Sequence, residues 1–213
     1  MHRIFTTLAL LIVATGAKAE VTGNIGFLSD YIYRGVPQAS SVANGGLDWS
    51  QDDWYLGTWA AAVKPGLEVD VYGGYKHVFE NDLMLGAGFT LYYYSDDFDD
   101  TYKEVNLYAG YKFVELEYTV GDYENFTGPT LDYDFIALTG TYKDFYAKFG
   151  TFGKDFDGEY LEVGYGISVA ELDLGLSLVR SSKELALNTG TNGLPAEDTF
   201  LVISISKSFG ILD

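Results

Sequence analysis

Apolar and polar residues alternate with a period of two along almost the whole chain. Between Leu67 and Tyr75, for example, every odd position is apolar, aromatic or glycine, and the even positions include Glu68 and Asp70. Successive side chains of a β-strand point to opposite faces of the sheet, so this pattern is typical of a strand with one apolar face. No segment has the i, i+3, i+4, i+7 spacing of an amphipathic helix. The sequence therefore predicts an all-β fold.

Twelve segments carry this alternation. They span residues 21–34, 43–50, 54–63, 67–77, 83–94, 102–111, 114–122, 133–142, 145–152, 160–169, 172–180 and 199–209. Three tight turns test their register, because a two-residue hairpin loop places the residues on either side of it on the same face of the sheet. The loops at 112–113, 143–144 and 170–171 each join two apolar faces under this rule. Turn lengths and alternation therefore indicate one register.

Short and long connections fall on opposite sides of the predicted sheet. Tight turns follow the sixth, eighth and tenth strands, whereas the connections at 35–42, 95–101, 123–132 and 181–198 are long and polar. Outer-membrane barrels have short periplasmic turns and longer extracellular loops. The short connection at 64–66 is expected to be a low point of the outer rim. The sequence thus predicts a transmembrane antiparallel β-barrel of about twelve strands with both termini on the periplasmic side.

A soluble sandwich or a lipocalin-like barrel shares this periodicity but turns its apolar face inward. Aromatic residues near the strand ends favour the membrane barrel, because such residues form girdles at the membrane interfaces. The expected girdle residues are Tyr31, Tyr33, Trp49, Trp54, Tyr93, Tyr111, Phe145 and Phe209. We therefore expect the apolar face of each strand to contact lipid.

The beginning of the chain has the features of a secretory signal peptide. Arg3 precedes an apolar run over residues 4–14, and Ala17 and Ala19 place small residues at the −3 and −1 positions of a cleavage site. The run is shorter than the roughly 20 residues of a membrane-spanning helix. We expect residues 1–19 to be removed and residues 20–213 to form one outer-membrane barrel domain.

Charge and composition exclude several functional classes. Asp and Glu number 31 against 13 Lys and Arg, a net charge of −18, so the chain lacks the basic surface that nucleic acids require. The absence of Cys excludes disulfide frameworks, Cys-ligated zinc and thiol catalysis. His77 is the only histidine after the signal peptide, and it is expected at the periplasmic rim facing lipid. We expect no enzymatic activity, no cofactor and no metal site.

The polar face of each strand is expected to line the lumen, and acids outnumber bases on it. The candidate pore-lining residues are Asp30, Arg34, Asp48, Glu68, Asp70, Lys76, Glu104, Glu115, Glu117, Lys148, Glu162 and Asp173, with Asp134 as a further inward acid. Eight-stranded barrels are packed inside and barrels of sixteen or more strands hold an aqueous channel, so twelve strands predict a narrow lumen. A surplus of carboxylates in such a tube favours cations.

The segment 54–63 has two candidate outward faces. One contains Trp54 and Leu56, and the other contains Tyr55 and Trp59. A four-residue loop over 50–53 keeps Trp49 and Trp54 on one face and so favours the first.

The acidic loop at 95–100 (Ser-Asp-Asp-Phe-Asp-Asp) is compatible with calcium binding, because hard cations prefer clustered carboxylates. It lacks the spacing and the turn glycine of an EF-hand, and acidic surface loops are usually only solvated. Whether this loop binds divalent cations stays open in the sequence.

Four short blocks carry a family resemblance. They are residues 29–38 (SDYIYRGVPQ), 45–48 (GGLD), 57–60 (GTWA) and 68–75 (EVDVYGGY). In this order and spacing they make the chain resemble the bacterial TorF family of porins. Pro37 and Ala61-Ala62 depart from the family pattern, where Ser and Ser-Asn are expected. The resemblance implies a Gram-negative outer-membrane β-barrel without an agreed substrate.

The last strand ends its outward apolar row at Phe209. A terminal aromatic of this kind resembles the assembly signal of outer-membrane proteins and is also an interface anchor. The expected partners are therefore the outer-membrane assembly machinery, membrane lipid and lipopolysaccharide, and small solutes or ions.

Together these features favour a porin or narrow channel for passive diffusion of small hydrophilic solutes, with a preference for cations. The alternative is a non-conducting structural or interaction barrel that presents its outer loops. A conductance measurement discriminates the two.

Overall fold

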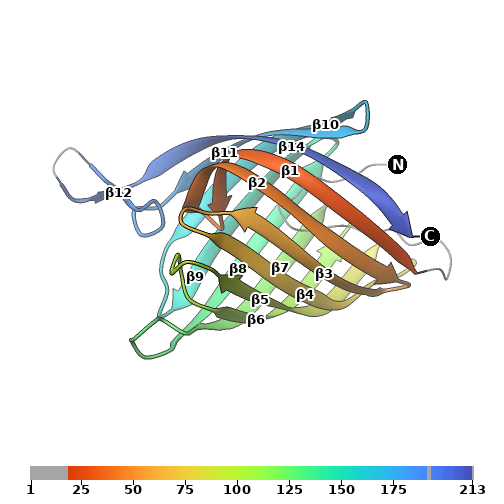
Figure 1. Cartoon of the computed structure of the whole chain (residues 1–213). Helices are drawn as coiled ribbons and strands as arrows, with labels where there is room; N and C mark the ends of the chain where they lie inside the picture. Colours follow the sequence, from red (N-terminus) through yellow and green to blue (C-terminus); the bar gives the residue numbers. More distant parts are fainter. Residues whose placement is uncertain (1–18, 191–192, 213) are drawn as a thin grey trace.

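The computed structural model describes residues 19–190 and 193–212. Twelve long strands form a closed antiparallel barrel (Figure 1), as predicted. Their bounds are β1 Glu20–Tyr33, β2 Val36–Gln51, β3 Trp54–Ala62, β4 Leu67–Val78, β5 Leu83–Tyr94, β6 Tyr102–Tyr111, β7 Val114–Tyr123, β8 Leu131–Tyr142, β9 Phe145–Lys154, β10 Glu159–Val169, β11 Leu172–Ser181 and β14 Asp198–Leu212. Except for Ala19, the expected signal peptide lies outside the described residues.

Each strand pairs with its neighbours in the chain, and β14 pairs with β1 to close the barrel. The last connection adds a two-stranded sheet of β12 (Asn188–Thr189) and β13 (Pro195–Ala196). Over the residues described here, no helix is long and apolar enough to cross a membrane. The start of β1 and the end of β14 lie at the end of the barrel that carries the short turns, and β12 lies at the other end (Figure 1). The predicted separation of short turns and long loops is confirmed.

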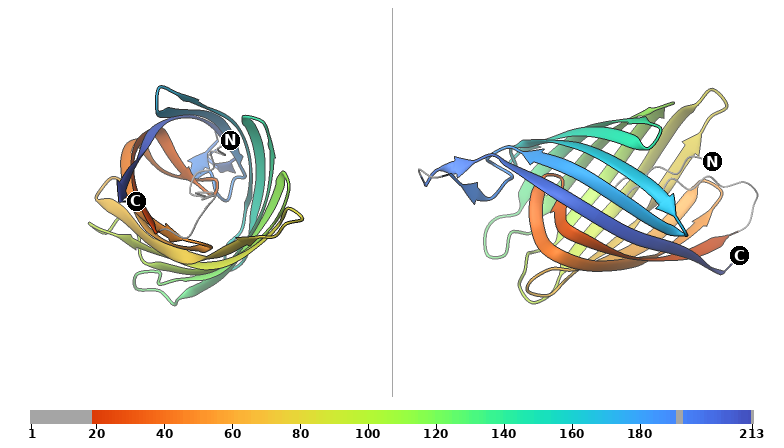
Figure 2. Two further views of the ribbon diagram at one scale, coloured as in Figure 1. Left: turned by 90° about the vertical axis from the view of Figure 1, so that its right-hand side faces the viewer. Right: turned by 90° about the horizontal axis from the view of Figure 1, so that it is seen from above.

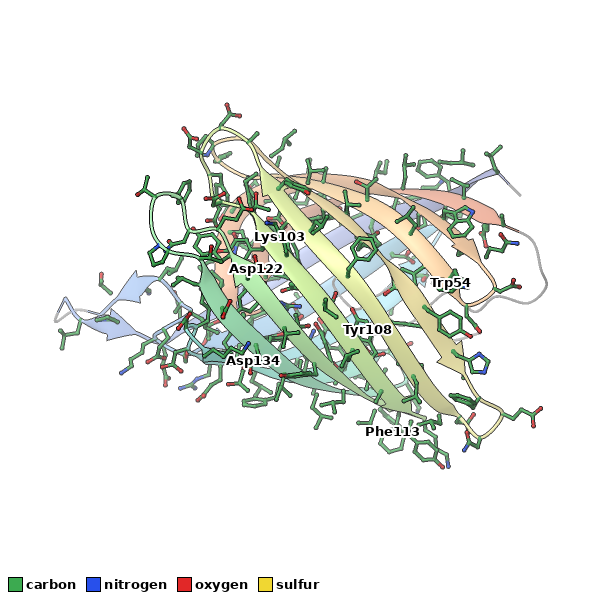
Figure 3. All side chains as sticks on the ribbon, turned by 90° about the horizontal axis from the view of Figure 1, so that it is seen from below. Trp54, Lys103, Tyr108, Phe113, Asp122 and Asp134 are labelled. Atoms are coloured by element: carbon green, nitrogen blue, oxygen red, sulfur yellow. The ribbon has the colours of Figure 1, made fainter. Side chains whose placement is uncertain are left out.

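Exposed apolar side chains cover the outside of the barrel. Trp54 and Leu56 on β3 are 59% and 50% exposed, whereas Trp59 on the same strand is buried inside. This outcome confirms the favoured face of β3. Figure 3 shows Trp54 and Phe113 near the end with the short turns, and Lys103 near the opposite end. Because apolar groups cover the outside while carboxylates are buried within, the outer wall is the lipid-facing surface.

β1 and β2 belong to the barrel wall over only part of their length. β1 pairs with β14 only from Val21 to Leu28, and β2 pairs with β3 only from Asn44 to Gln51. Beyond these residues the two strands pair only with each other, up to the turn at 34–35. Figure 2 shows this red and orange hairpin inside the ring of the other strands. We call residues 29–43 the inner hairpin.

The bend of the inner hairpin is built into its backbone. Ser41 has a positive φ of 59°, and the pairing of β1 with β2 skips from Leu28–Val42 to Asp30–Ser40. At this level the Ser29 hydroxyl accepts a hydrogen bond from the Ile203 backbone N–H at 2.9 Å, the last contact with β14. Residues in the left-handed region and skipped pairs both bend a ribbon. The hairpin therefore turns inward at Ser29 and Ser41.

Two apolar clusters hold the inner hairpin in place. One contains Leu28, Tyr31 and Val42 with Trp59, Ala61 and Val63 of the β3 side, and Tyr33 and Ala39 pack against it. In the other, Ile32 and Val36 pack against Phe135, Ala137, Tyr160, Val179 and Leu185. The hairpin thus packs apolar side chains on both of its faces, where Tyr31 and Val42 are buried and Ile32 and Val36 are half-buried.

Two predictions fail at this hairpin. Residues 36–42 belong to β2, so the segment 35–42 is not an extracellular loop. Tyr31 and Tyr33 are not girdle residues, because the bend turns the outward face of β1 into the lumen. The other expected girdle residues lie on the outer wall: Trp54, Tyr93, Tyr111, Phe145 and Phe209 are exposed, and Trp49 pairs with Leu56 on the same face.

Candidate functional site

Arg34, at the tip of the inner hairpin, binds the opposite wall of the barrel. Its guanidinium makes a two-point ion pair with Glu104 on β6, in which Nη2 lies 3.2 Å from Oε2. Nη2 also lies 2.9 Å from Oε1 of Glu117 on β7, and the guanidinium covers the ring of Phe135 on β8 at 4.2 Å. Arg34 is buried. The inner hairpin therefore spans the lumen and is fixed at its far end by charge.

The turn that carries Arg34 requires glycine at its second position. Arg34 and Gly35 both have positive φ, 47° and 82°, as in the two-residue turns that join tightly twisted strands. A Cβ on Gly35 would lie 2.7 Å from Cβ of Tyr160 on β10. The Gly35 carbonyl accepts a hydrogen bond from the Ser181 hydroxyl of β11 at 2.6 Å. The tip is thus fitted closely against β10 and β11.

A shell of hydroxyl and amide groups surrounds Glu104. Its carboxylate accepts hydrogen bonds from Tyr92 at 3.0 Å, Asn106 at 3.1 Å and Tyr133 at 2.7 Å. All three donors are buried. The sequence analysis missed them, because a neutral inward side chain carries no signal that separates it from ordinary wall packing. Their donation satisfies the buried oxygens of Glu104.

Lys148 on β9 extends this network toward the periplasmic side. Its Nζ lies 3.5 Å from Oε2 of Glu117, so Glu117 bridges Arg34 and Lys148. The side chains of Glu117 and Lys148 keep 16% and 17% exposure. Both residues lie inside the barrel, so this exposure is to the lumen. We call Arg34, Glu104, Glu117 and Lys148 the constriction network.

The near side of the inner hairpin is held by tyrosine hydroxyls. Tyr31 donates to Oε1 of Glu68 on β4 at 2.6 Å, and its ring meets Trp59 edge-on at 5.4 Å. The hydroxyls of Tyr33 and Tyr92 are hydrogen-bonded to each other. Glu68 and Asp70, predicted to face inward, are both buried beneath this contact. The hairpin therefore touches polar groups on both walls.

The periplasmic half of the lumen holds the remaining predicted residues. Lys76 places Nζ 3.7 Å from the ring centroid of Tyr108, and Asp48 accepts hydrogen bonds from Tyr72 at 2.5 Å and Asn24 at 3.2 Å. Glu162 accepts a hydrogen bond from Tyr146, and Asp173 accepts one from Ser168 at 2.7 Å near the rim. Glu115 lies on the inward row of β7 with Glu117. This half is lined by polar groups of both charges.

Two predicted inward acids lie elsewhere. Asp134 shares its face of β8 with the exposed Ile136, whereas the buried Tyr133 and Phe135 take the inward positions. Asp134 is therefore an outer-rim residue, as Figure 3 shows for it and for Asp122. Asp30 lies on the inner hairpin, where it accepts a hydrogen bond from Ser40 at 2.7 Å, and does not project from the wall.

The acidic loop uses two of its carboxylates to hold neighbouring segments. Asp99 accepts hydrogen bonds from the hydroxyls of Tyr102 at 3.0 Å and Tyr123 at 2.8 Å. Asp100 accepts from the backbone N–H of Phe126 in the next loop at 2.6 Å. No group of three acidic, histidine or cysteine side chains suited to a metal ion occurs within residues 19–190 and 193–212. Asp99 and Asp100 thus join two extracellular loops.

His77 lies on the outer wall beside the β2–β3 turn. Its Nδ1 donates to Oδ2 of Asp53 at 2.7 Å, and Tyr75 donates to the same oxygen at 2.8 Å. These two hydrogen bonds lower the pKa of the Asp53 carboxyl from its ordinary value, and the bond from His77 has the larger effect. Trp54 packs edge-on against Tyr75 at 5.0 Å. The arrangement is an aromatic and polar patch at the membrane interface.

Comparison with solved structures gives the fold. A chain from a study entitled "Unveiling the Mechanism Behind the in-meso Crystallization of Membrane Proteins" aligns with a TM-score of 0.58 at 12% identity, over 90% of this chain and 84% of that one. OccK1 (OpdK) of Pseudomonas aeruginosa aligns with a TM-score of 0.43 at 12% identity, over 86% of this chain and 60% of its own. OprD of Pseudomonas aeruginosa gives a TM-score of 0.41 at 10% identity, over 92% and 67%. This chain thus spans about 60% of OccK1.

A closed antiparallel barrel with an apolar outer wall and a polar interior is the architecture of outer-membrane proteins, and it locates this chain in the outer membrane. None of the curated proteins matches the chain. A family model matches residues 14–178, which include the inner hairpin and most of the constriction network's wall. The chain belongs to the Gcw_chp family, bacterial proteins of unknown function.

Proposed function

We propose that this barrel is an outer-membrane porin, a narrow channel for passive diffusion of small hydrophilic solutes, in which the inner hairpin forms the narrowest point. The observation that carries the proposal is the exposure of Glu117 and Lys148 to the inside of a barrel whose outside is apolar. Charged side chains that keep such exposure require water around them. Water therefore reaches the constriction network from the periplasmic side.

Cation preference is part of this proposal. Among the inward side chains Glu104 and Glu117 are neutralised by Arg34 and Lys148, whereas Glu68, Asp70, Asp48, Glu115 and Glu162 have no basic partner among the ion pairs of the described residues. Facing carboxylates in a low-dielectric tube reinforce one another's field. The surplus of acids thus supports selection of cations over anions.

Planar-bilayer conductance of the refolded barrel tests the proposal. Arg34→Ala removes the charge that fixes the hairpin to the far wall, and we expect a larger single-channel conductance than that of the unmodified barrel. Arg180→Ala is the matched control, because Arg180 pairs with Glu197 in an exposed loop contact. Equal conductance for both variants would show that the hairpin is not the narrowest point. Silence of a verified folded barrel in all three forms removes the channel assignment.

A non-conducting structural barrel is the second candidate, and the inner hairpin itself favours it. The two apolar clusters fill the extracellular half of the lumen on both sides of the hairpin. If this filling is permanent, the outer loops carry the function. The conductance measurement above distinguishes the two, because only the channel conducts in its unmodified form.

The remaining assignments belong to the same proposal. Residues 1–19 act as a signal peptide, the chain is a member of the TorF family of porins, and it has no enzymatic activity. Lipid and lipopolysaccharide contact its outer wall, and the outer-membrane assembly machinery recognises the strand that ends near Phe209. Cleavage before Glu20, found by mass spectrometry of the mature protein, tests the first of these.

A further inference from the structure

Glu68 and Asp70 leave three carboxylate oxygens unsatisfied in the interior of the barrel. Both side chains project inward from β4, and each residue is only 1% exposed. Oε1 of Glu68 accepts the hydrogen bond from Tyr31, but Oε2 of Glu68 and both oxygens of Asp70 are buried without a hydrogen-bond partner. Buried polar atoms are nearly always satisfied in folded proteins. These three oxygens therefore point to a missing donor.

A positively charged partner would compensate both carboxylates. Within the part of the chain that the structure describes, Arg34 pairs with Glu104 and Glu117, and Lys148 pairs with Glu117. None of the ion pairs there includes Glu68 or Asp70. Two neighbouring carboxylates buried without compensation are strongly unfavourable. The pair therefore selects a cation.

The number and kind of groups at the pair favour an ammonium over a metal ion. Calcium takes six to eight oxygen ligands, whereas this site offers three, and no third acidic or histidine ligand joins them in the described chain. A primary ammonium has three N–H donors, one for each unsatisfied oxygen. Trp59 and Tyr92 flank Asp70 on the adjacent strands, and aromatic faces attract such a cation further.

We propose that Glu68 and Asp70 form a binding site for the primary ammonium group of a small solute, with Tyr31 of the inner hairpin as its cover. The proposal rests on the proposed channel, because the solute reaches the pair through the lumen. Since both carboxylates are enclosed while Tyr31 donates to Glu68, the ammonium enters only when Tyr31 moves aside. Binding of the solute and displacement of the inner hairpin are thus one event.

Calorimetric titration of the folded barrel in detergent tests the site without requiring conduction. Methylammonium chloride is the probe, and tetramethylammonium chloride has the same charge without N–H donors. We expect methylammonium to bind, tetramethylammonium not to bind, and Asp70→Asn or Glu68→Gln to weaken methylammonium at least tenfold. Asp134→Asn, on the outer rim, is the matched control and leaves the affinity unchanged. Tyr31→Phe frees the fourth oxygen and is expected to bind methylammonium more tightly.

Each other outcome overturns the site. Equal affinity for tetramethylammonium would mean that the acids attract any cation through their negative potential alone. Calcium binding with loss of methylammonium binding would indicate a metal site. A third outcome is that methylammonium does not bind and that the infrared spectrum contains a band of protonated carboxyl groups. If Asp70→Asn removes this band, protons neutralise the pair. The channel is tested separately by conductance in KCl, so binding without conductance retains the site and removes the channel. Each variant's fold is checked by its faster migration on gels before heating.

Discussion

Arg34 and Glu104 are 70 residues apart in the sequence and form a buried two-point ion pair across the barrel interior. Arg34 belongs to a hairpin of two wall strands, and Glu104 belongs to the wall that this hairpin faces. The pair therefore holds the tip of the inner hairpin against the opposite wall. Several of the outcomes predicted below depend on it.

Arg34→Ala should destabilise the barrel by about 3–5 kcal/mol, because it leaves Glu104 buried without its cation and Glu117 paired with Lys148 alone. Arg180→Ala removes the exposed pair with Glu197 and should cost less than about 1 kcal/mol. Urea titration of the folded band on unheated gels gives both values. Similar midpoints for the two variants would contradict the buried role of Arg34.

Gly35→Ala should destabilise the barrel more than Gly193→Ala. Both glycines have positive φ, 82° and 74°, so both substitutions carry the same backbone penalty of about 1 kcal/mol. Only at Gly35 does the new methyl group meet other atoms, those of Tyr160 and Leu185, whereas Gly193 has open space. The difference between the urea midpoints of the two variants therefore measures how tightly the hairpin tip packs against Tyr160 and Leu185. Equal effects would mean that the tip is loosely packed.

Selectivity should depend on salt and on lumen charge. In a gradient of dilute KCl the reversal potential should indicate cation preference, and it should fade in concentrated KCl, because the Debye length falls from about 30 Å at 0.01 M to about 3 Å at 1 M. Glu115→Gln should weaken the preference and Lys148→Gln should strengthen it. Anion preference of the unmodified barrel contradicts the electrostatic interpretation of the lumen.

Stability should fall in acid through Asp53. Hydrogen bonds from His77 and Tyr75 lower the pKa of this carboxyl in the folded state, so it contributes stability above its ordinary pKa of about 3.9. That contribution disappears as the pH falls through the lowered folded-state pKa. Asp53→Asn should therefore be less stable than the unmodified barrel near neutral pH and equal to it once the pH lies below the lowered folded-state pKa of Asp53. Asp52→Asn, in the same turn, is the control; an equal loss there would refute the assignment.

Phe209→Ala should reduce the amount of barrel in the outer membrane. Phe209 pairs with Gly23 across the seam between β1 and β14, and its ring covers the position where a Cβ of Gly23 would lie. Loss of the ring exposes this glycine and removes an interface anchor. Phe126→Ala is the control, because Phe126 lies in a loop and is 56% exposed. Quantitative blotting of membrane fractions gives the comparison.

The wall of this barrel could be predicted from the sequence because a single rule governs it. In a wall strand such as β7, alternation and the 112–113 turn both specify which side chains face lipid, and Glu115 and Glu117 face inward as expected. The same rule places Asp134 on the outward face with Ile136, so its prediction as an inward acid is wrong. Where each residue has two wall neighbours, local pattern and structure agree.

The inner hairpin could not be predicted in this way. Pro37, Ser40 and Ser41 have the composition of a loop, and Tyr31 continues an apparently lipid-facing row. The available signal was the apolar character of both faces around Ile32, which suits a strand buried on both sides. All four members of the constriction network are predicted to face the lumen because they are charged, whereas the neutral donors Asn106 and Tyr133 around Glu104 are not. Contacts across a lumen leave no periodic trace in the sequence.

The departure of β1 and β2 from the wall means that the molecule has no single strand number. At the end with the termini, twelve strands define the circumference. Beyond Leu28 and Ala43 neither β1 nor β2 is paired with β14 or β3, which leaves ten strands in the wall. β14 and β3 do not pair with each other, so the ladder of paired strands is interrupted between them toward the extracellular mouth. Strand pairing alone therefore divides the molecule into a closed periplasmic half and an extracellular half with one unpaired seam.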